Sequence, residues 1–288
     1  MAHTPVLLNE VLEYLNPRPG DVFIDATING GGHAKAIAER IGKKGKLLGI
    51  DRDCELVEKF QVSDFQLICD TFANIQHIAE DHGFTDVDGI IFDLGFSSFH
   101  IEQSGRGFSF LRDEPLDMRF DSRKDIPARD IINKWPEHEL RELLRTTGEE
   151  RFGRSIARQI VRERDRVPIE RTFQLVEIIR RAVPGRYRQG RIHFATRTFQ
   201  ALRMCVNDEL KHVAQGVERA VWLLKPGGRI AVLSFHSGED RIVKDIFRSL
   251  EQEDIVKRVI KKPVRAATEE MRNNLRARSA KLRVAERL

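Results

Sequence analysis

Short apolar runs alternate with helical patterns along the first hundred residues of the chain. Residues 21–25, 47–50, 65–68 and 87–94 have the composition of strands, and residues 34–41 have helical spacing. Continuous apolar strands separated by helices predict a parallel sheet that is covered on both faces. With right-handed crossovers, this arrangement belongs to the doubly wound α/β class.

The alternation stops near residue 107, where several helical patterns follow without a clear strand, and it resumes near residue 207. Residues 208–224 predict a helix ending at a breaker cluster, 225–228. A strand at 229–235 precedes a helix at 239–250, where Ser237 and Asp240 have the spacing of a capping box. Residues 255–260 and 280–285 predict a closing antiparallel pair. We therefore expect an α/β domain of residues 1–106 and 208–288, interrupted by an inserted helical domain, 107–207.

The composition excludes several classes of protein. The chain is 41% hydrophobic and 32% charged, as in globular proteins. It has no apolar run of about eighteen residues for a membrane helix and no signal-peptide pattern at its start. Cys54, Cys69 and Cys205 form no CxxC pair, and the nine histidines show no metal-ligand spacing. We expect a cytoplasmic protein without a disulfide or a bound metal.

The charge is unevenly distributed along the chain. Residues 1–106 carry 9 basic and 17 acidic residues, net −8, whereas residues 107–207 carry 22 and 15, net +7. Residues 208–250 carry 7 and 6, net +1, and residues 251–288 carry 11 and 6, net +5. The middle and the tail therefore favour a polyanion such as nucleic acid, although a basic helix face is often only solvated.

A glycine-rich turn and two later residues form a candidate cofactor site. Gly30, Gly31 and Gly32 lie between the first strand and the first helix, where backbone N–H groups can bind the anionic end of a ligand. Asp51, at the end of the second strand, can accept hydrogen bonds from ribose hydroxyls. Phe72, after the third strand, can form an apolar wall for adenine. The alternatives are a turn without ligand, a helix-capping Asp51 and a core Phe72.

These features alone do not separate S-adenosylmethionine from NAD. The glycines do not form a GxGxxG pattern, which disfavours a dinucleotide. The closing antiparallel pair favours a methyltransferase sheet.

Asp93 ends the fourth strand, at the edge where doubly wound sheets bind their ligands. The lone pair of an exocyclic base amine is delocalised into the ring, so methylation needs an acceptor for the N–H. Asp93 is a candidate for that acceptor, and equally for a residue that orders the loop or binds only cofactor. His236 is a candidate substrate contact, although a capping or buried histidine is favoured. Arg197 is a candidate phosphate ligand, with a surface salt bridge as the alternative.

Arginines recur at spacings of three and four within the central segment. Arg151, Arg154, Arg158 and Arg162 would share one helix face, with residues 156 and 160, both Ile, directed towards a core. Such a face can bind phosphates, or it can pair with the glutamates at 149, 150 and 163. The tail adds six further basic residues between 272 and 287. With only two Trp and two Tyr, we expect RNA recognition by shape and phosphates, with one base extruded into the pocket.

Ordered motifs over nearly the whole chain resemble the ribosomal RNA small subunit methyltransferase H family, also called MraW. The matching blocks are residues 3–8, 30–33, 49–53, 92–95, 106–110, 115–119, 148–152, 195–203, 234–244 and 278–283. The resemblance implies a class I methyltransferase sheet with an inserted helical, RNA-binding domain. It also implies S-adenosylmethionine-dependent N4-methylation of a cytidine in the decoding centre of 16S ribosomal RNA.

The family's cofactor contacts fall on seven positions of this chain: Gly31, Gly32, His33, Asp51, Phe72, Asp93 and His100. Asp93 is also the expected catalytic residue, and Arg154, Arg158 and Arg197 are the expected RNA contacts. The chain departs from the family pattern at Asn29 (usually Gly), His100 (usually Gln), Phe194 (usually Pro) and Gly238 (usually Leu). Asn tolerates a left-handed backbone, so we expect the turn and the activity to be retained.

Other functions remain compatible with the sequence. A DNA or protein amine methyltransferase would use the same cofactor chemistry, an assembly protein could retain the fold without catalysis, and an NAD-dependent oxidoreductase shares the sheet class. The partner is expected to be small-subunit ribosomal RNA or the assembled subunit, with no membrane. The oligomeric state, with a homodimer among the alternatives, and the identity of any general base stay open.

Overall fold

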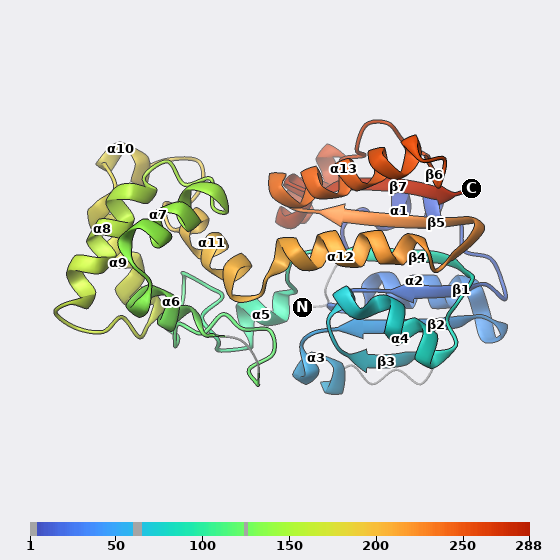
Figure 1. The fold of residues 1–288 in the computed structure, drawn as a ribbon, viewed down its shortest axis with the longest axis horizontal. Helices are drawn as coiled ribbons and strands as arrows, with labels where there is room; N and C mark the ends of the chain where they lie inside the picture. Colours follow the sequence, from blue (N-terminus) through green and yellow to red (C-terminus); the bar gives the residue numbers. More distant parts are fainter. Residues whose placement is uncertain (1–4, 60–64, 124–125) are drawn as a thin grey trace. The chain divides into compact units, whose positions relative to one another are not determined.

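The computed structural model describes residues 5–59, 65–123 and 126–288 (Figure 1). His3 and Thr4, in the first block of the family pattern, lie outside the described residues. The chain forms two compact units, a sheet unit (Met1–Ser97 and Leu210–Leu288) and a helical unit (Ser98–Glu209). The helical unit begins before the expected position 107, because the short helix α5 (Ser98–Glu102) already belongs to it.

The sheet unit is built on seven described strands in the order β3-β2-β1-β4-β5-β7-β6. They are β1 (Val22–Asp25), β2 (Lys46–Asp51), β3 (Gln66–Cys69), β4 (Val87–Asp93), β5 (Leu224–Ser234), β6 (Val256–Arg258) and β7 (Lys281–Arg287). The first five pair in parallel, and β7 runs antiparallel to both β5 and β6. The predicted doubly wound sheet and its antiparallel closing pair are therefore confirmed.

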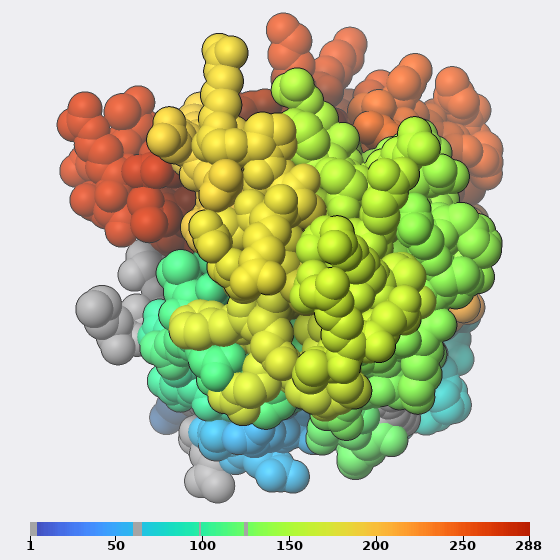
Figure 2. Space-filling model, turned by 90° about the vertical axis from the view of Figure 1, so that its left-hand side faces the viewer, coloured from blue at the N-terminus to red at the C-terminus, as the bar shows by residue number. Residues whose placement is uncertain are grey.

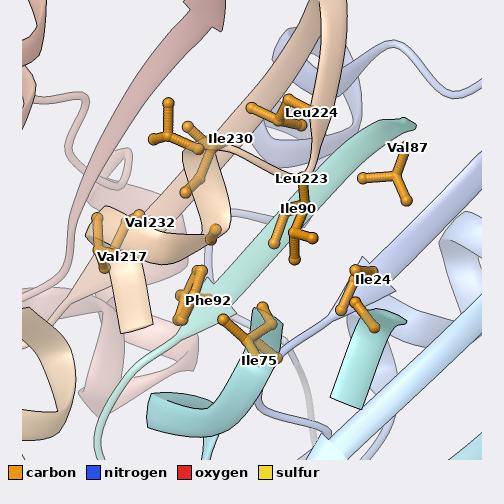
Figure 3. Packing of buried hydrophobic residues seen from close by; sticks show 14 of the residues in the cluster. Ile24, Ile75, Val87, Ile90, Phe92, Val217, Leu223, Leu224, Ile230 and Val232 are labelled. Atoms are coloured by element: carbon orange, nitrogen blue, oxygen red, sulfur yellow. The ribbon is translucent and has the colours of Figure 1, made fainter. Parts of the chain in front are cut away.

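Successive residues of the central strands are buried on opposite faces of the sheet. Ile90 and Phe92 pack into one apolar cluster, and Ile91 between them packs into the other. Figure 3 shows the first cluster, in which Ile24 and Ile230 from neighbouring strands lie beside Ile90. Burial on both faces explains why these strands have continuous apolar sequences.

Helices cover both faces of the sheet. One cluster includes residues of α4 (Ile75–His82), α12 (Glu209–Val221) and α13 (Ser237–Gln252). The other includes α1 (Leu8–Leu15) and α2 (Gly32–Ile41). The remaining short elements of this unit are η1 (Gly42–Lys44), α3 (Cys54–Lys59), η2 (Phe72–Asn74), α14 (Thr268–Asn273) and η3 (Leu275–Arg278).

Two local predictions are wrong. The expected breaker cluster at 225–228 lies inside β5, because the pairing with β4 shifts register between Val87 and Gly89 and accommodates the extra residues as a bulge. The capping box of α13 is formed by His236 and Glu239, one residue earlier than the predicted Ser237 and Asp240. His236 is therefore a capping histidine, the interpretation that the sequence favoured.

The helical unit contains α6 (Ala128–Lys134), α7 (Glu137–Thr146), α8 (Gly153–Arg164), α9 (Thr172–Ala182), α10 (Gly185–Arg188) and α11 (Thr196–Val206), besides α5. Each long helix buries one apolar stripe, such as Leu140 and Leu144 on α7 and Ile156 and Ile160 on α8, and α7 packs on α8. Figure 2 shows side chains of this unit in green to yellow. None of the helices described in either unit has the length and apolarity to cross a membrane.

Candidate active site

Three aspartates end neighbouring strands of the sheet unit. Asp25 ends β1, Asp51 ends β2 and Asp93 ends β4, and β1 pairs with both of the other strands in parallel. The three carboxylates therefore lie at the same edge of the sheet, beside the turn that leads from β1 to α2. This edge is where doubly wound sheets bind ligands.

The turn between β1 and α2 depends on two left-handed residues. Asn29 has φ 49°, so the expectation that Asn would adopt this conformation in place of Gly is confirmed. Gly31 has φ 70° and is the N-cap residue of α2. Gly32 is needed for a different reason, because a Cβ there would lie 2.9 Å from Cγ of Pro5. The glycines thus shape the turn and leave backbone N–H groups at the start of a helix.

Asp51 holds this turn in place. One carboxylate oxygen accepts the N–H of Asn29 (2.9 Å), and the other accepts the N–H of Asp53 (3.0 Å). Asp53 itself caps α3, since its Oδ1 accepts the N–H of Glu55 at 3.1 Å. Asp51 is half-buried, and because a carboxylate oxygen can accept more than one hydrogen bond, it can also accept from a ribose hydroxyl.

Asp93 is buried, with 3% of its surface exposed. Its backbone N–H donates to Thr27 Oγ1, and Asn29 Nδ2 donates to its carbonyl oxygen (2.8 Å) and lies 3.4 Å from its Oδ2. Its Oδ1, in contrast, has no hydrogen-bond partner among the described residues. A buried carboxylate oxygen without a donor is costly, so this atom is suited to receive an N–H from a ligand.

His33 contacts Asp93 from the first turn of α2. It is buried, its Nε2 donates to the carbonyl oxygen of Val6 (3.0 Å), and its Nδ1 lies 3.9 Å from Asp93 Oδ2. The Val6 bond fixes the orientation of the ring. A contact of 3.9 Å is too long for a hydrogen bond, so His33 can orient Asp93 only by packing beside its carboxylate.

Asp25 belongs to the same group of carboxylates, although the sequence reasoning did not select it. It is buried and accepts the N–H of Thr27 at 3.0 Å. Burial raises the pKa of Asp25 well above its ordinary value, and the charges of Asp93 and Asp51 add to the increase. Three acidic groups at one edge favour a ligand with positive charge.

Phe72 lies in η2, after β3, and is half-buried. Its ring meets the edge of Phe92 at a centroid distance of 5.5 Å. A Cβ on Gly216 of α12 would lie 2.6 Å from the Phe72 ring, so the helix packs directly against it. Phe72 thus packs on the core with part of its surface exposed, which is compatible with both predicted roles.

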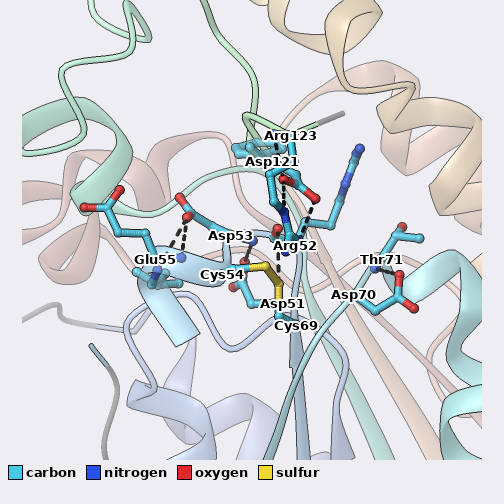
Figure 4. Close-up of a disulfide and its surroundings, with 12 residues drawn as sticks. Asp51, Arg52, Asp53, Cys54, Glu55, Cys69, Asp70, Thr71, Asp121 and Arg123 are labelled. Carbon is cyan, nitrogen blue, oxygen red and sulfur yellow. Dashed lines mark hydrogen bonds and ion pairs between the residues drawn. A yellow bond between two sulfur atoms is a disulfide. The ribbon is translucent and has the colours of Figure 1, made fainter. Parts of the chain in front are cut away.

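A disulfide joins Cys54 and Cys69, so the expectation of no disulfide is wrong (Figure 4). The two cysteines are 15 residues apart in sequence, but β2 and β3 pair with Asp51 opposite Cys69. Cys54 begins the helix that follows β2, which brings the two Cα atoms to 5.1 Å. The disulfide therefore lies directly beside Asp51, and the cysteines no longer support a reducing compartment.

His100 lies in the helical unit, unlike the other six predicted cofactor residues. It is buried among aromatic rings, with centroids at 4.8 Å from Phe120, 5.2 Å from Phe108 and 5.8 Å from Phe99. This environment makes His100 part of the core of its own unit. Its predicted cofactor contact stays a prediction.

The predicted arginine face is present on α8, and Arg151 extends it just before the helix begins. Arg151, Arg154, Arg158 and Arg162 are all exposed, while Ile156 and Ile160 are fully buried as expected. In the part of the chain that the structure describes, no ion pair involves these four arginines. Two of the glutamates proposed as their partners are engaged elsewhere, since Glu150 accepts from Tyr187 and Glu163 from Gln159.

The other basic candidates are more strongly engaged within the protein. Arg197 is half-buried in α11, and its charge acts on Tyr187. In the tail, Lys281 and Arg283 both bind Asp240, at 2.7 and 2.8 Å. Arg276 lies over the ring of Phe235. Much of the basic tail therefore stabilises the sheet unit, which the charge count alone did not reveal.

Comparisons with known proteins cover the whole chain. The model of the MraW methylase family matches residues 1–288. A protein of Syntrophotalea carbinolica named ribosomal RNA small subunit methyltransferase H is 45% identical over 307 residues, covering 99% of this chain and 98% of that protein. The protein of the same name from Geobacter sulfurreducens is 44% identical over 308 residues, covering 100% and 99%. That from Brevibacillus brevis is 40% identical over 307 residues, covering 99% and 98%.

Proposed function

Because the chain belongs to the MraW methylase family, it is a methyltransferase, and we propose that it methylates N4 of a cytidine in the decoding centre of 16S ribosomal RNA. The methyl donor is S-adenosylmethionine, and the reaction takes place in the cytoplasm on the small-subunit RNA or the assembled subunit. The observation that carries the proposal is the buried carboxylate of Asp93, whose Oδ1 lacks a donor among the described residues.

The edge of the sheet has the groups that this cofactor requires. S-adenosylmethionine carries a positively charged sulfonium, an ammonium, a carboxylate and an adenosine. Asp51 would accept hydrogen bonds from the ribose, and Phe72 would contact the adenine. Gly31, Gly32 and the turn before α2 would hold the anionic end of the cofactor. The negative charge of Asp51 and Asp93 complements its cationic groups, and a bound cation would favour the ionised form of Asp25.

The cofactor supplies an electrophilic methyl group when bound, and Asp93 acts on the acceptor. The N4 amine of cytidine is a poor nucleophile because its lone pair is delocalised into the ring. Asp93 Oδ1 would accept a hydrogen bond from the N–H, which localises the lone pair, and would take up that proton as N4 gains the methyl group. Holding the amine in position beside the methyl group would supply much of the remaining rate enhancement.

Two neighbours keep Asp93 oriented. Asn29 donates to both the carbonyl oxygen and Oδ2 of Asp93, and His33 lies beside Oδ2. Both neighbours contact the backbone carbonyl oxygen or Oδ2 of Asp93, so Oδ1 can accept a hydrogen bond from the substrate. Asn29 and His33 are therefore positioning residues in this proposal.

The helical unit binds the RNA. Arg154 and Arg158 are exposed, and no ion pair to them exists within the described ranges, so both can contact phosphates. Arg197, on α11, is a further candidate, although its charge already acts on Tyr187. A base would have to leave its stack to reach the buried Asp93.

The test is methyl transfer from radiolabelled S-adenosylmethionine to purified small subunits and to naked small-subunit RNA, followed by nucleoside analysis. We expect label in N4-methylcytidine with at least one of these acceptors. Label in another nucleoside would contradict the target atom. If the cofactor binds but no RNA is labelled, the acceptor is a different molecule.

A further inference from the structure

A partly exposed stack of aromatic rings lies in the helical unit. Phe110 and His193 are stacked with a centroid distance of 4.6 Å and an interplanar angle of 5°. His193 and Phe194 are stacked at 4.2 Å and 30°. His193 is exposed and both phenylalanines are half-buried. We call these three residues the ring stack.

Two further contacts hold the ring stack, one from Phe199 and one from the backbone of Ala195. Phe199, a buried residue of α11, and Phe110 pack edge to face at a centroid distance of 5.6 Å. The backbone N–H of Ala195 donates to Nδ1 of His193 at 3.3 Å, which leaves the proton of the neutral ring on Nε2. Partial burial lowers the pKa of His193, so the neutral form prevails at neutral pH. The rings are thus preorganised, so binding would cost little conformational entropy.

The surroundings of the ring stack are apolar and positively charged. Leu111, next to Phe110, is 71% exposed, and Ile192, next to His193, is 46% exposed. The segment immediately before His193 carries three exposed arginines, Arg186, Arg188 and Arg191. Their side chains have no ion pair or hydrogen bond to any residue that the structure describes. Partly exposed rings beside arginines without an acidic partner are typical of surfaces that bind single-stranded nucleic acid.

We propose that the ring stack binds an unpaired base of the RNA substrate, with Arg186, Arg188 and Arg191 contacting the neighbouring phosphates. The inference rests on the proposed function, since it assumes that the substrate is RNA. It adds base stacking to the expected recognition by shape and phosphates with one base extruded into the pocket. That expectation counted Trp and Tyr, whereas the rings here are Phe and His. Phe194 stands where the family pattern has Pro, so this part of the stack is a feature of this chain.

The test compares two fluorescent single-stranded RNA probes, a pyrimidine octamer and the same octamer with its central bases removed. Binding of each probe to the full-length protein is measured by anisotropy. The test variant is Phe194→Leu, which keeps an apolar side chain and removes the ring. Phe194→Trp restores an aromatic ring. The matched control is Phe173→Leu, because Phe173 of α9 is also exposed, at 48%, and lies outside the stack.

We expect Phe194→Leu to weaken binding of the intact octamer by about ten-fold, because stacking on an aromatic side chain contributes on the order of that factor per base. Phe194→Trp should restore the affinity, and Phe173→Leu should leave it unchanged. The probe without bases should bind wild type and Phe194→Leu equally, and the salt dependence should be the same for both proteins, since they bind the same phosphates.

Two results would overturn the proposal. Equal affinity of wild type and Phe194→Leu for the intact octamer would mean that no base stacks there. An equal loss of affinity for both probes would mean that the ring only supports the fold. Methyl transfer by the wild-type protein to small subunits is measured separately. Its absence would count against the proposed function, whereas a change in probe affinity between the variants reports on the stack alone.

Discussion

The two units of the protein present opposite chemistry. In the sheet unit, the candidate site consists of three acidic side chains at the ends of neighbouring strands, two of them buried. Backbone N–H groups hold the carboxylates of Asp25 and Asp51, whereas Oδ1 of Asp93 has no donor among the described residues. In the helical unit, the candidate surface is centred on the exposed arginines Arg154, Arg158 and Arg162, which form no ion pair with any residue that the structure describes. The first arrangement suits a small cationic ligand in a fixed orientation, and the second suits a flexible polyanion. The proposed function therefore assigns catalysis to the sheet unit and substrate affinity to the helical unit, so variants should separate the two.

The largest effect is expected at Asp93. Asp93→Asn keeps the size of the side chain and removes the charged acceptor, so turnover should fall by about 10²- to 10⁴-fold. RNA affinity should change little, because the arginines of the helical unit are untouched. Rates at saturating RNA and a separate binding assay measure the two quantities. Asp130→Asn, on α6, removes an equal charge from a surface ion pair and serves as the control. Full turnover in Asp93→Asn would leave this residue no chemical role.

Asp51 should affect the cofactor and not the RNA. Asp51→Ala removes the acceptor for ribose hydroxyls and for the N–H of Asn29, so cofactor affinity should fall about ten- to hundred-fold. Calorimetric titration with S-adenosylmethionine measures the change. Glu55→Ala, on the exposed side of α3, is the control. Unchanged affinity would remove Asp51 from the cofactor site.

The arginine face should affect RNA and not the cofactor. Replacing Arg154 and Arg158 together by Ala should weaken RNA binding by about ten-fold and reduce the salt slope by about one for each phosphate that the variant can no longer bind. The matched control replaces Arg180 and Arg181, which are also on a helix but are both paired with Glu177. An unchanged salt slope in the Arg154 and Arg158 variant would mean that this face does not contact phosphates.

The acidic site also predicts a pH effect on cofactor binding. The pKa of Asp25 is raised in the free protein, so its ionisation destabilises the fold as pH rises through that raised value. A bound cation lowers this pKa again, and cofactor affinity should therefore increase with pH while Asp25 titrates, by at most about ten-fold for each step of one in pH. The cationic S-adenosylmethionine should show a larger increase than the uncharged thioether of S-adenosylhomocysteine. Asp25→Asn should abolish the difference, and equal pH profiles for both ligands in wild type would contradict the interpretation.

The disulfide gives a smaller, structural effect. Closing a chain segment of 15 residues between Cys54 and Cys69 should stabilise the folded state by about 3 kcal/mol relative to the reduced protein. Denaturant unfolding of the protein with and without reductant measures the difference. Cys205→Ser is the control, because burial raises the pKa of its thiol to about 11 and keeps it protonated. Identical stability under both conditions would mean that the bond does not persist in solution.

The fold was largely predictable because strands that are buried on both faces have continuous apolar sequences. Ile90, Ile91 and Phe92 are apolar in succession, because they pack alternately into the two clusters of the core. The bulge in β5 was not predictable, because Pro226 and two glycines usually indicate a break and only the register with β4 includes them in the strand.

The candidate site could be predicted for residues that the local sequence marks, but not for pairs of residues that only the fold brings together. Asp51 and Asp93 each follow an apolar run, and Asn29 was correctly expected to adopt a left-handed conformation. The pairing of Cys54 with Cys69 results from the register of β2 and β3. Likewise, Phe110 and His193 of the ring stack come from separate segments of the chain, so the local sequence around either residue does not predict their contact.

The most direct test of the division between the two units combines Asp93→Asn with the replacement of Arg154 and Arg158 by Ala. Steady-state methyl transfer to small subunits is measured for wild type, both variants and the combination. We predict that Asp93→Asn lowers kcat, that the arginine variant raises KM at unchanged kcat, and that the combined variant shows both changes with free energies that add within about 0.5 kcal/mol. A lower kcat in the arginine variant at saturating RNA, or strongly non-additive effects, would contradict the account.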